Sequence, residues 1–284
     1  MKLSDLIKDE GIVVVPGCYD PLTAKIVENC GFKATYLGGW AAGAHLTVTE
    51  PMTTLTDMVD LARKINVNLN IPLMIDGAAA FGNLAAVTRT VREIELTGVQ
   101  AIHIEDQVVP KRAHYHKGVI DLISPREMVQ KLEKALEVRK SKDFLIIGRT
   151  DAGRNKEEPF ENAIERANIY ASIGVDMVMV FPRNMDEVRM APEKITAPLV
   201  YVASEGLGRP IPTPAELQQL GYKMVIYPLT PILAAFQSVR NVYTTLKQNG
   251  KSGFSQEETA RLSAEVLEII SIPELIKLEE ESYQ

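Results

Sequence analysis

The sequence predicts a single (β/α)8 barrel, in which eight parallel strands alternate with helices and close into a ring. Short apolar, β-branched segments alternate along the chain with longer segments of helical spacing. The strand segments are apolar throughout, as expected of a sheet that is buried on both faces. The 284 residues also suit a fold that usually needs about 250. An open doubly wound sheet is the alternative, but residues 15–20 read VPGCYD and lack its glycine-rich phosphate turn.

The first strand–helix units can be justified in order. The first helix begins at Pro21 behind Asp20, a candidate N-cap, and stops before Gly31. The second helix carries Leu55 and Met58 on one apolar face, and the third ends at Gly98. We expect strands at residues 13–15, 34–37, 72–75 and 101–104, and helices at 21–29, 54–65 and 84–96.

The second half of the chain continues the alternation. Ser124 precedes a helix that starts with Pro125, and Gly174 ends the next helix. We expect strands at residues 144–147, 177–180, 199–202 and 224–227, and helices at 125–138, 159–173, 231–246 and about 256–270. Strand–helix–strand units imply parallel strands with right-handed crossovers. Because no linker or low-complexity segment interrupts the pattern, residues 1–284 are predicted to form one catalytic domain.

Composition narrows the class of function. Hydrophobic residues make up 46% of the chain and charged residues 24%, which predicts a folded core. A net charge of −6 provides no basic face for nucleic acid or for an anionic membrane, and no apolar run approaches the roughly 18 residues of a membrane span. The N-terminus lacks the pattern of a signal peptide, and Cys18 and Cys30 are too few for a disulfide framework. We therefore expect a cytoplasmic enzyme with reduced thiols.

Polar residues follow the strands at the end where barrel enzymes carry their active sites. Gly38 and Gly39 follow the second strand and could offer backbone N–H groups to an anion, or simply form a tight turn. Asp76 and Glu105 end the third and fourth strands and supply the oxygen ligands that Mg²⁺ prefers, unless they form an ion pair or a helix cap. Arg149 ends the fifth strand and suits a substrate carboxylate or a structural ion pair.

The longest polar segment, residues 107–118, follows the fourth strand and is predicted to form a lid over the barrel mouth. It contains Lys111, which would attract an anionic substrate. His114, Tyr115 and His116 could act as an acid/base group, and the histidines could alternatively bind Mn²⁺ or Zn²⁺ or lie on the surface without a role.

These residues resemble the isocitrate lyase/phosphoenolpyruvate mutase superfamily, and the order and spacing are most similar to its methylisocitrate lyase and 2,3-dimethylmalate lyase branch. The resemblance extends from about Gly17 to Gly250 and rests on the motifs Tyr36-Leu37-Gly38-Gly39, Ile104-Glu105-Asp106-Gln107 and Arg149-Thr150-Asp151-Ala152. It implies a barrel whose last barrel helix is exchanged between the subunits of a homo-oligomer, either dimer or tetramer. It also implies Mg²⁺ and a 2-oxo or 2-hydroxy acid that reacts through an enolate.

The resemblance also implies roles for individual residues. Asp76 and Glu105 would hold the metal ion, and Lys111 would belong to the gating loop. A further set would bind the substrate: Tyr36, Gly38, Gly39, Arg149 and Glu205.

Several positions depart from the family pattern. Ala113 stands where the lyases carry a proton-transferring Cys, and Ala78 stands in place of a second metal-associated Asp. Another acidic position falls on Thr49, with Glu50 beside it. Gly38 replaces a small hydroxyl residue, and Val202 replaces an Asn.

The sequence therefore favours metal-assisted C–C cleavage of a small di- or tricarboxylic acid, by a lyase or a decarboxylase. Histidine or tyrosine of the loop would replace the missing thiol. P–C bond chemistry, as in carboxyvinyl-carboxyphosphonate phosphorylmutase or phosphoenolpyruvate mutase, is the alternative, although Gln107 stands where those enzymes favour Lys. A barrel that binds a 2-oxo acid without turnover is a second alternative, supported by Ala78.

Overall fold

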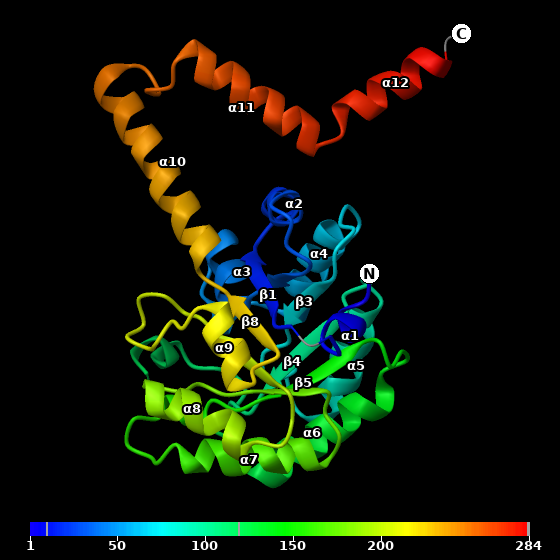
Figure 1. Ribbon diagram of the computed structural model, residues 1–284, viewed down its shortest axis with the longest axis vertical. Helices are drawn as coiled ribbons and strands as arrows, with labels where there is room; N and C mark the ends of the chain where they lie inside the picture. The colour runs from blue at the N-terminus through cyan, green and yellow to red at the C-terminus, as the bar shows by residue number, and fades with distance from the viewer. Residues whose placement is uncertain (10, 119, 283–284) are drawn as a thin grey trace. The chain divides into compact units, whose positions relative to one another are not determined.

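The computed structural model describes residues 1–9, 11–118 and 120–282, and its first compact unit is a barrel. In this part of the chain, eight parallel strands close into a ring in sequence order, β1 to β8, with β8 paired to β1. This confirms the predicted fold class (Figure 1). The strands are β1 (Val13–Cys18), β2 (Thr35–Leu37), β3 (Leu73–Asp76), β4 (Ala101–Glu105), β5 (Leu145–Arg149), β6 (Met177–Met179), β7 (Leu199–Val202) and β8 (Met224–Tyr227).

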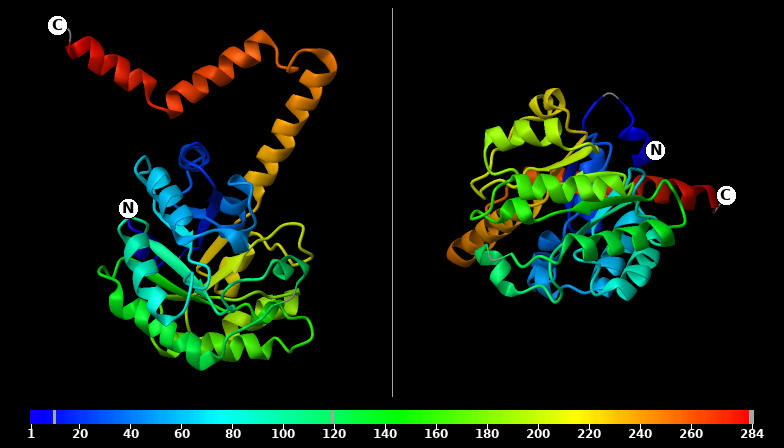
Figure 2. Two further views of the ribbon diagram at one scale, coloured as in Figure 1. Left: turned by 180° about the vertical axis from the view of Figure 1, so that it is seen from behind. Right: turned by 90° about the horizontal axis from the view of Figure 1, so that it is seen from below.

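Helices cover the outside of the strands, as the further views show for α6 and α7 (Figure 2). The helices of the barrel unit are α1 (Leu3–Leu6), α2 (Pro21–Asn29), α3 (Gly39–His45), α4 (Leu55–Asn66), α5 (Leu84–Glu95), α6 (Pro125–Val138), α7 (Glu161–Ser172), α8 (Met185–Lys194) and α9 (Pro214–Leu220). Short 3₁₀ turns add η1 (Glu50–Met52), η2 (Ala113–Lys117) and η3 (Ala152–Arg154). The sequence pattern did not predict α1, α3, α8 or α9. The Gly/Ala-rich α3 lacks an apolar period, and Pro192 lies inside α8.

The predicted helix boundaries depend on local chemistry that the structure confirms. The Asp20 carboxylate accepts a hydrogen bond from the Thr23 N–H at 2.7 Å, so α2 has an N-terminal cap. Gly31, Gly98 and Gly174 have left-handed φ values of +85°, +81° and +85° directly after helices, which is the conformation that glycine adopts most readily.

The core of the barrel unit has two layers. Inward side chains such as Val15, Met74 and Ile147 fill the interior of the barrel, and Leu3 of α1 packs into the same cluster. The Leu3 N–H donates a hydrogen bond to Gln100, which precedes β4, so α1 covers the N-terminal ends of the strands. Outward side chains pack against the helices. The C-terminal ends of the strands are consequently the end that is left for a cavity.

The segment Leu233–Gln284 forms a second compact unit, which contains most of α10 (Thr230–Asn249), α11 (Gln256–Ile269) and α12 (Ile272–Ser282). None of its described helical residues is buried, and apolar side chains such as Phe236 and Leu278 are exposed. Within the described ranges, the chain has no helix that combines the length and apolarity needed for a membrane span. Two expectations stay predictions: that a helix is exchanged between subunits, and that residues 1–284 form a single domain.

Candidate active site

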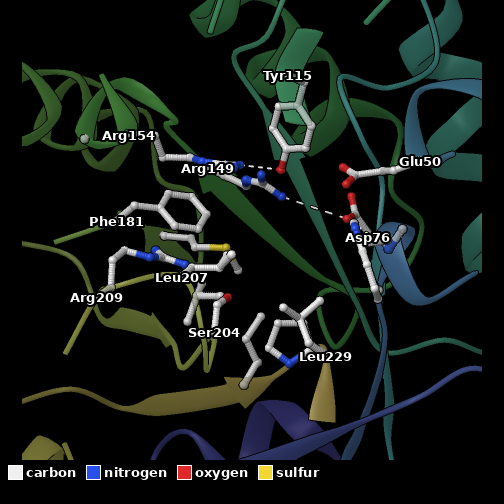
Figure 3. A pocket seen from close by; sticks show the side chains of 18 of the residues that line it. Glu50, Asp76, Tyr115, Arg149, Arg154, Phe181, Ser204, Leu207, Arg209 and Leu229 are labelled. Carbon is white, nitrogen blue, oxygen red and sulfur yellow. Dashed lines mark hydrogen bonds and ion pairs between the residues drawn. The ribbon is translucent and has the colours of Figure 1, made fainter. Parts of the chain in front are cut away.

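A cavity of about 530 Å³ lies at the C-terminal ends of the barrel strands. Its lining comes from loops that follow most of the strands, as catalytic groups do in barrel enzymes. Figure 3 shows the side chains of 18 of the residues that line it. The polar and aromatic part of the lining comprises Tyr36, Trp40, Glu50, Asp76, Tyr115, His116, Arg149, Arg154, Lys156, Phe181, Arg183, Ser204 and Arg209.

Three carboxylates, here called the acidic cluster, lie on one side of the site: Glu50, Asp76 and Glu105. Asp76 ends β3 and is buried, and it accepts hydrogen bonds from the N–H groups of Gly39 (3.1 Å) and Ala78 (2.8 Å). Glu105 ends β4 and is fully buried. Glu50 begins η1 and is brought to the site by the loop after α3.

Two cations neutralise the acidic cluster. The Lys111 ammonium forms ion pairs with Glu50 and, at 3.0 Å, with Glu105. The Arg149 guanidinium lies 3.0 Å from the other oxygen of Glu105 and 3.9 Å from Asp76. Burial alone would lower the pKa of Lys111, but the Glu105 and Glu50 carboxylates raise it instead. The lysine is therefore fixed as a cation beside the cavity.

Burial is the largest influence on the pKa of Glu105. Loss of water raises the pKa of its carboxyl to about 7, although Arg149 and Lys111 oppose that shift. In the described structure, neither of its side-chain oxygens has a hydrogen-bond partner of good geometry. A carboxyl group that is half-ionised near neutral pH can accept or release a proton during a reaction.

Tyr36, which the family resemblance implies is a substrate-binding residue, lines the cavity. Its hydroxyl is 2.8 Å from Nε2 of the buried His103 and 3.4 Å from Asp76. Burial lowers the pKa of His103 to about 4, so this imidazole is neutral at physiological pH. The tyrosine oxygen is thus held in a fixed position at the cavity wall.

Close backbone approach explains the two glycines after β2. A Cβ atom on Gly38 would lie 2.9 Å from the Tyr36 ring, and one on Gly39 would lie 2.9 Å from the Asp76 carboxylate. Both residues line the cavity. The Gly39 N–H, however, already donates to Asp76. The prediction that both N–H groups face the substrate is therefore not supported at Gly39, because its N–H already donates to Asp76.

The structure separates the four predicted catalytic residues of the loop. Tyr115 is buried and lines the cavity, and its ring centroid lies 3.8 Å from the Lys111 ammonium. His116 also lines the cavity, and its Nε2 atom lies 2.6 Å from the Thr49 hydroxyl. His114 is exposed and does not contribute to the lining.

Glu205 lies away from the cavity in this structure. Its side chain is exposed and accepts a hydrogen bond from the Thr230 hydroxyl at 2.6 Å. The loop after β7 instead presents Ser204 and Arg209 to the cavity. The predicted substrate contact of Glu205 stays a prediction that this arrangement does not support.

A second charged group on the cavity wall, here called the arginine cluster, was not found from the sequence: Arg154, Arg183 and Arg209. It lies on the loops after β5, β6 and β7. Arg154 donates hydrogen bonds to the Tyr115 hydroxyl and to Asp151. The sequence signal was available, because each arginine follows a strand by a few residues, but loop residues give no periodicity from which to infer a side-chain direction.

Comparison with known proteins places the chain among enzymes of small organic acids. The profile of the phosphoenolpyruvate phosphomutase family matches residues 3–247. The 2,3-dimethylmalate lyase of Eubacterium barkeri is 35% identical, covering 87% of this chain and 86% of that protein. The 2-methylisocitrate lyase of Aeropyrum pernix is 36% identical, covering 87% of this chain and 80% of that protein.

Solved structures agree in fold over the whole chain. Oxaloacetate acetylhydrolase in complex with 3,3-difluorooxalacetate superposes with a TM-score of 0.90 at 25% identity, covering 99% of this chain and 96% of that one. Phosphonopyruvate hydrolase in complex with oxalate and Mg²⁺ superposes with a TM-score of 0.86 at 23% identity, covering 99% of this chain and 98% of that one.

Proposed function

The chain belongs to the phosphoenolpyruvate phosphomutase family, and on that premise we propose that it cleaves a C–C bond in a small 2-oxo or 2-hydroxy di- or tricarboxylic acid through an enolate. The observation that carries this proposal is the position of Arg149. Its guanidinium lines the cavity and is held between the acidic cluster and Asp151, with its Nε atom 2.8 Å from that carboxylate. A planar guanidinium held in this way suits the carboxylate of a substrate.

The proposed chemistry needs an electron sink and a proton carrier. When the C–C bond of a 2-hydroxy acid breaks, the hydroxyl loses its proton to a base, a carbonyl product leaves, and the bonding electrons form an enolate. The positive charges of Lys111 and Arg149 lie beside the cavity and would stabilise that enolate. The enolate carbon then takes up a proton. Tyr115 and His116, which line the cavity, are our candidates for its donor in the absence of a loop thiol.

We propose Mg²⁺ as the cofactor, with Mn²⁺ as the alternative, held by Asp76 and Glu105. Carboxylate oxygens are the ligands that such ions prefer, and both Glu105 oxygens are buried without a well-formed hydrogen bond in the described structure. Among the described residues, however, no three His, Cys, Asp or Glu side chains are grouped closely enough to hold a metal ion. Lys111 also occupies the space between Glu50 and Glu105. The ion would therefore compete with Lys111 and bind weakly. When bound, it would withdraw electron density from a substrate oxygen.

The proposed function is tested by turnover. Oxaloacetate, 2,3-dimethylmalate, 2-methylisocitrate and phosphonopyruvate should be assayed with Mg²⁺, with Mn²⁺ and with a chelator. Pyruvate formed from any of the first three supports C–C cleavage. Release of phosphate from phosphonopyruvate, or its conversion to phosphoenolpyruvate, without C–C cleavage supports the P–C alternative. Tight binding of oxalate with no turnover of any substrate would establish a non-catalytic barrel.

We further propose that the enzyme is a cytoplasmic homo-oligomer, either dimer or tetramer. Support for assembly comes from the exposed apolar side chains of the second unit, among them Phe236, Leu267 and Leu278. Burial of such side chains against another copy of the chain would release water from an apolar surface. Light scattering coupled to size-exclusion chromatography tests the proposal, which a monomeric mass at micromolar concentration would contradict.

A further inference from the structure

Arg209 is the arginine of the cavity lining whose guanidinium lacks a partner in the described structure. Arg149 is paired with Glu105 and Asp151. Arg154 is paired with Asp151, and Arg183 forms a bidentate ion pair with Glu187. Arg209 forms no hydrogen bond or ion pair within the described ranges, and its guanidinium lies over the face of the Phe181 ring. A half-buried guanidinium normally has an acceptor, because all of its five N–H groups are donors.

The position of Arg209 is fixed by its surroundings. Its guanidinium carbon lies 4.9 Å from the centroid of the buried Phe181 ring. The next residue, Pro210, accepts a hydrogen bond from the Tyr201 hydroxyl at 2.6 Å, which ties the loop to β7. Gly206 and Gly208 have φ values of +82° and +70°, so the loop makes turns that a larger residue would resist. A cation held in advance of binding loses little freedom when an anion arrives.

The same phenylalanine ring connects Arg209 to the reacting end of the cavity. The guanidinium carbon of Arg149 also lies 4.9 Å from the Phe181 centroid, and that of Arg154 lies 5.4 Å away. In Figure 3 the Phe181 ring lies between Arg154 and Arg209. Arg149 and Arg209 therefore contact the same aromatic ring and both line the cavity, so one small diacid can approach both of them.

Local electrostatics favour an anion at this place. Burial, followed by the positive charge of Arg154, lowers the pKa of Arg209 to about 10. A carboxylate would relieve both effects, since it would supply a counter-charge and accept hydrogen bonds. The buried Ser204 lines the same part of the cavity and adds a hydroxyl donor.

We propose that Arg209, together with Ser204, binds the second carboxylate of the substrate, distal to the bond that breaks, while Arg149 binds the first. Arg209 is then a specificity-determining residue that selects dicarboxylates over monocarboxylates. This inference deepens the proposed function and rests on it for the direction of the substrate. Pyruvate has one carboxylate and can occupy only the Arg149 position, whereas succinate and 2-oxoglutarate carry a second carboxylate that can contact Arg209.

Binding of unreactive acids tests the proposal without any need for turnover. The dissociation constants of pyruvate, succinate and 2-oxoglutarate should be measured by isothermal titration calorimetry for the native chain, Arg209→Gln and Arg209→Lys. We expect Arg209→Gln to weaken the binding of succinate or 2-oxoglutarate at least about ten-fold, because a charge-assisted hydrogen bond is lost. Its affinity for pyruvate should stay within about two-fold, and Arg209→Lys should recover part of the loss.

Arg189→Gln is the matched control, because Arg189 is an exposed arginine paired only with Asp186 among the described residues. Thermal melting monitors the fold of each variant. The proposal is overturned if Arg209→Gln weakens the binding of pyruvate as much as that of the longer acids, if it weakens neither, or if the native chain binds pyruvate but neither longer acid. A selective loss for the longer acids in a chain that turns over no substrate would retain this subsite and reject only the proposed reaction.

Discussion

Of the two charged sides of the cavity, the acidic cluster has all of its charges compensated, whereas the arginine cluster contains one charge that is not compensated by any described residue. In the acidic cluster, each carboxylate contacts a cation or backbone N–H groups, and Lys111 and Arg149 are held by two or more carboxylates. In the arginine cluster, Arg209 has no counter-charge within the described structure. We infer that the acidic cluster, the compensated side, acts on a bound substrate. Arg209, on the other side, can bind a negatively charged group of that substrate.

This difference also separates structural from functional effects of mutation. Removal of one partner from a buried ion pair leaves the other charge uncompensated and costs about 3–5 kcal/mol of stability. Substitutions in the acidic cluster will therefore affect folding as well as activity. Arg209 leaves no buried carboxylate behind when it is replaced, so its effects should appear in binding.

The largest effect is expected from Arg149→Lys, which keeps the positive charge but loses the planar fork. We expect kcat/KM for the best substrate to fall at least about 100-fold, because a lysine cannot make the paired Nε and Nη2 hydrogen bonds through which Asp151 orients the guanidinium, and the bound acid shifts. Steady-state kinetics measures the fall, with circular dichroism melting to show that the variant is folded.

Arg189→Lys, on the exposed surface of α8, is the control for Arg149→Lys and should leave kcat/KM unchanged. Retention of near-native kcat/KM in Arg149→Lys would mean that the compensated side does not orient the substrate. The comparison between the two sides would then fail.

A smaller effect is expected at the loop over the cavity. His116→Ala should lower kcat at least about ten-fold if this imidazole carries the proton. His114→Ala is the natural control, since His114 lies two residues away but is exposed outside the cavity lining. Unchanged rates in both variants would exclude histidine as the replacement for the missing thiol and leave Tyr115 as the candidate donor.

The contrast between the two sides also shows what the sequence could predict. Asp76, Glu105 and Arg149 were found because they end strands, where the period of two and the closed barrel fix both position and direction. Helix caps such as Asp20 follow from local chemistry. Arg154 and Arg209 lie on loops, whose paths depend on contacts such as Tyr201 with Pro210 that are distant from any local pattern.

The same limitation explains the residues whose placement differs from expectation. Glu205 lies in the loop after β7, only four residues before Arg209, but it turns towards Thr230 and solvent. Gly39 occupies the predicted position, although its N–H is used by Asp76. In both cases the residue was identified from its position in the chain, and its hydrogen-bond partner depended on tertiary structure.

A carboxylate at position 78 should add negative charge beside the acidic cluster and so increase the difference between the two sides of the cavity. Ala78 lines an adjoining cavity of about 380 Å³ with Glu50 and Lys111, and its φ is +45°, a region that Asp tolerates better than Ala. We expect Ala78→Asp to tighten Mg²⁺ binding about five-fold, because an added carboxylate raises the charge of the site. Calorimetric titration measures the change, and Ala78→Asn is the neutral control. Equal affinities in the two variants would count against a metal ion at this place.

The smallest effect is expected from modification or substitution of the cysteines. This experiment decides whether a thiol elsewhere in the chain replaces the one that is missing from the loop. Cys18 ends β1 and is buried, and burial raises the pKa of its thiol to about 12. At pH 8 only roughly one thiol in ten thousand would then be the reactive thiolate. Cys30 is exposed.

Iodoacetamide at pH 8 should therefore modify Cys30 quickly and Cys18 only after unfolding, as mass spectrometry of peptides would show. The modified enzyme and a Cys30→Ser variant should keep their full kcat, because neither thiol lines the cavity. A loss of activity that follows the labelling of Cys18 in the folded protein would place a thiol in the reaction. The proton carrier would then have to be sought beside β1 rather than in the loop that holds Tyr115 and His116.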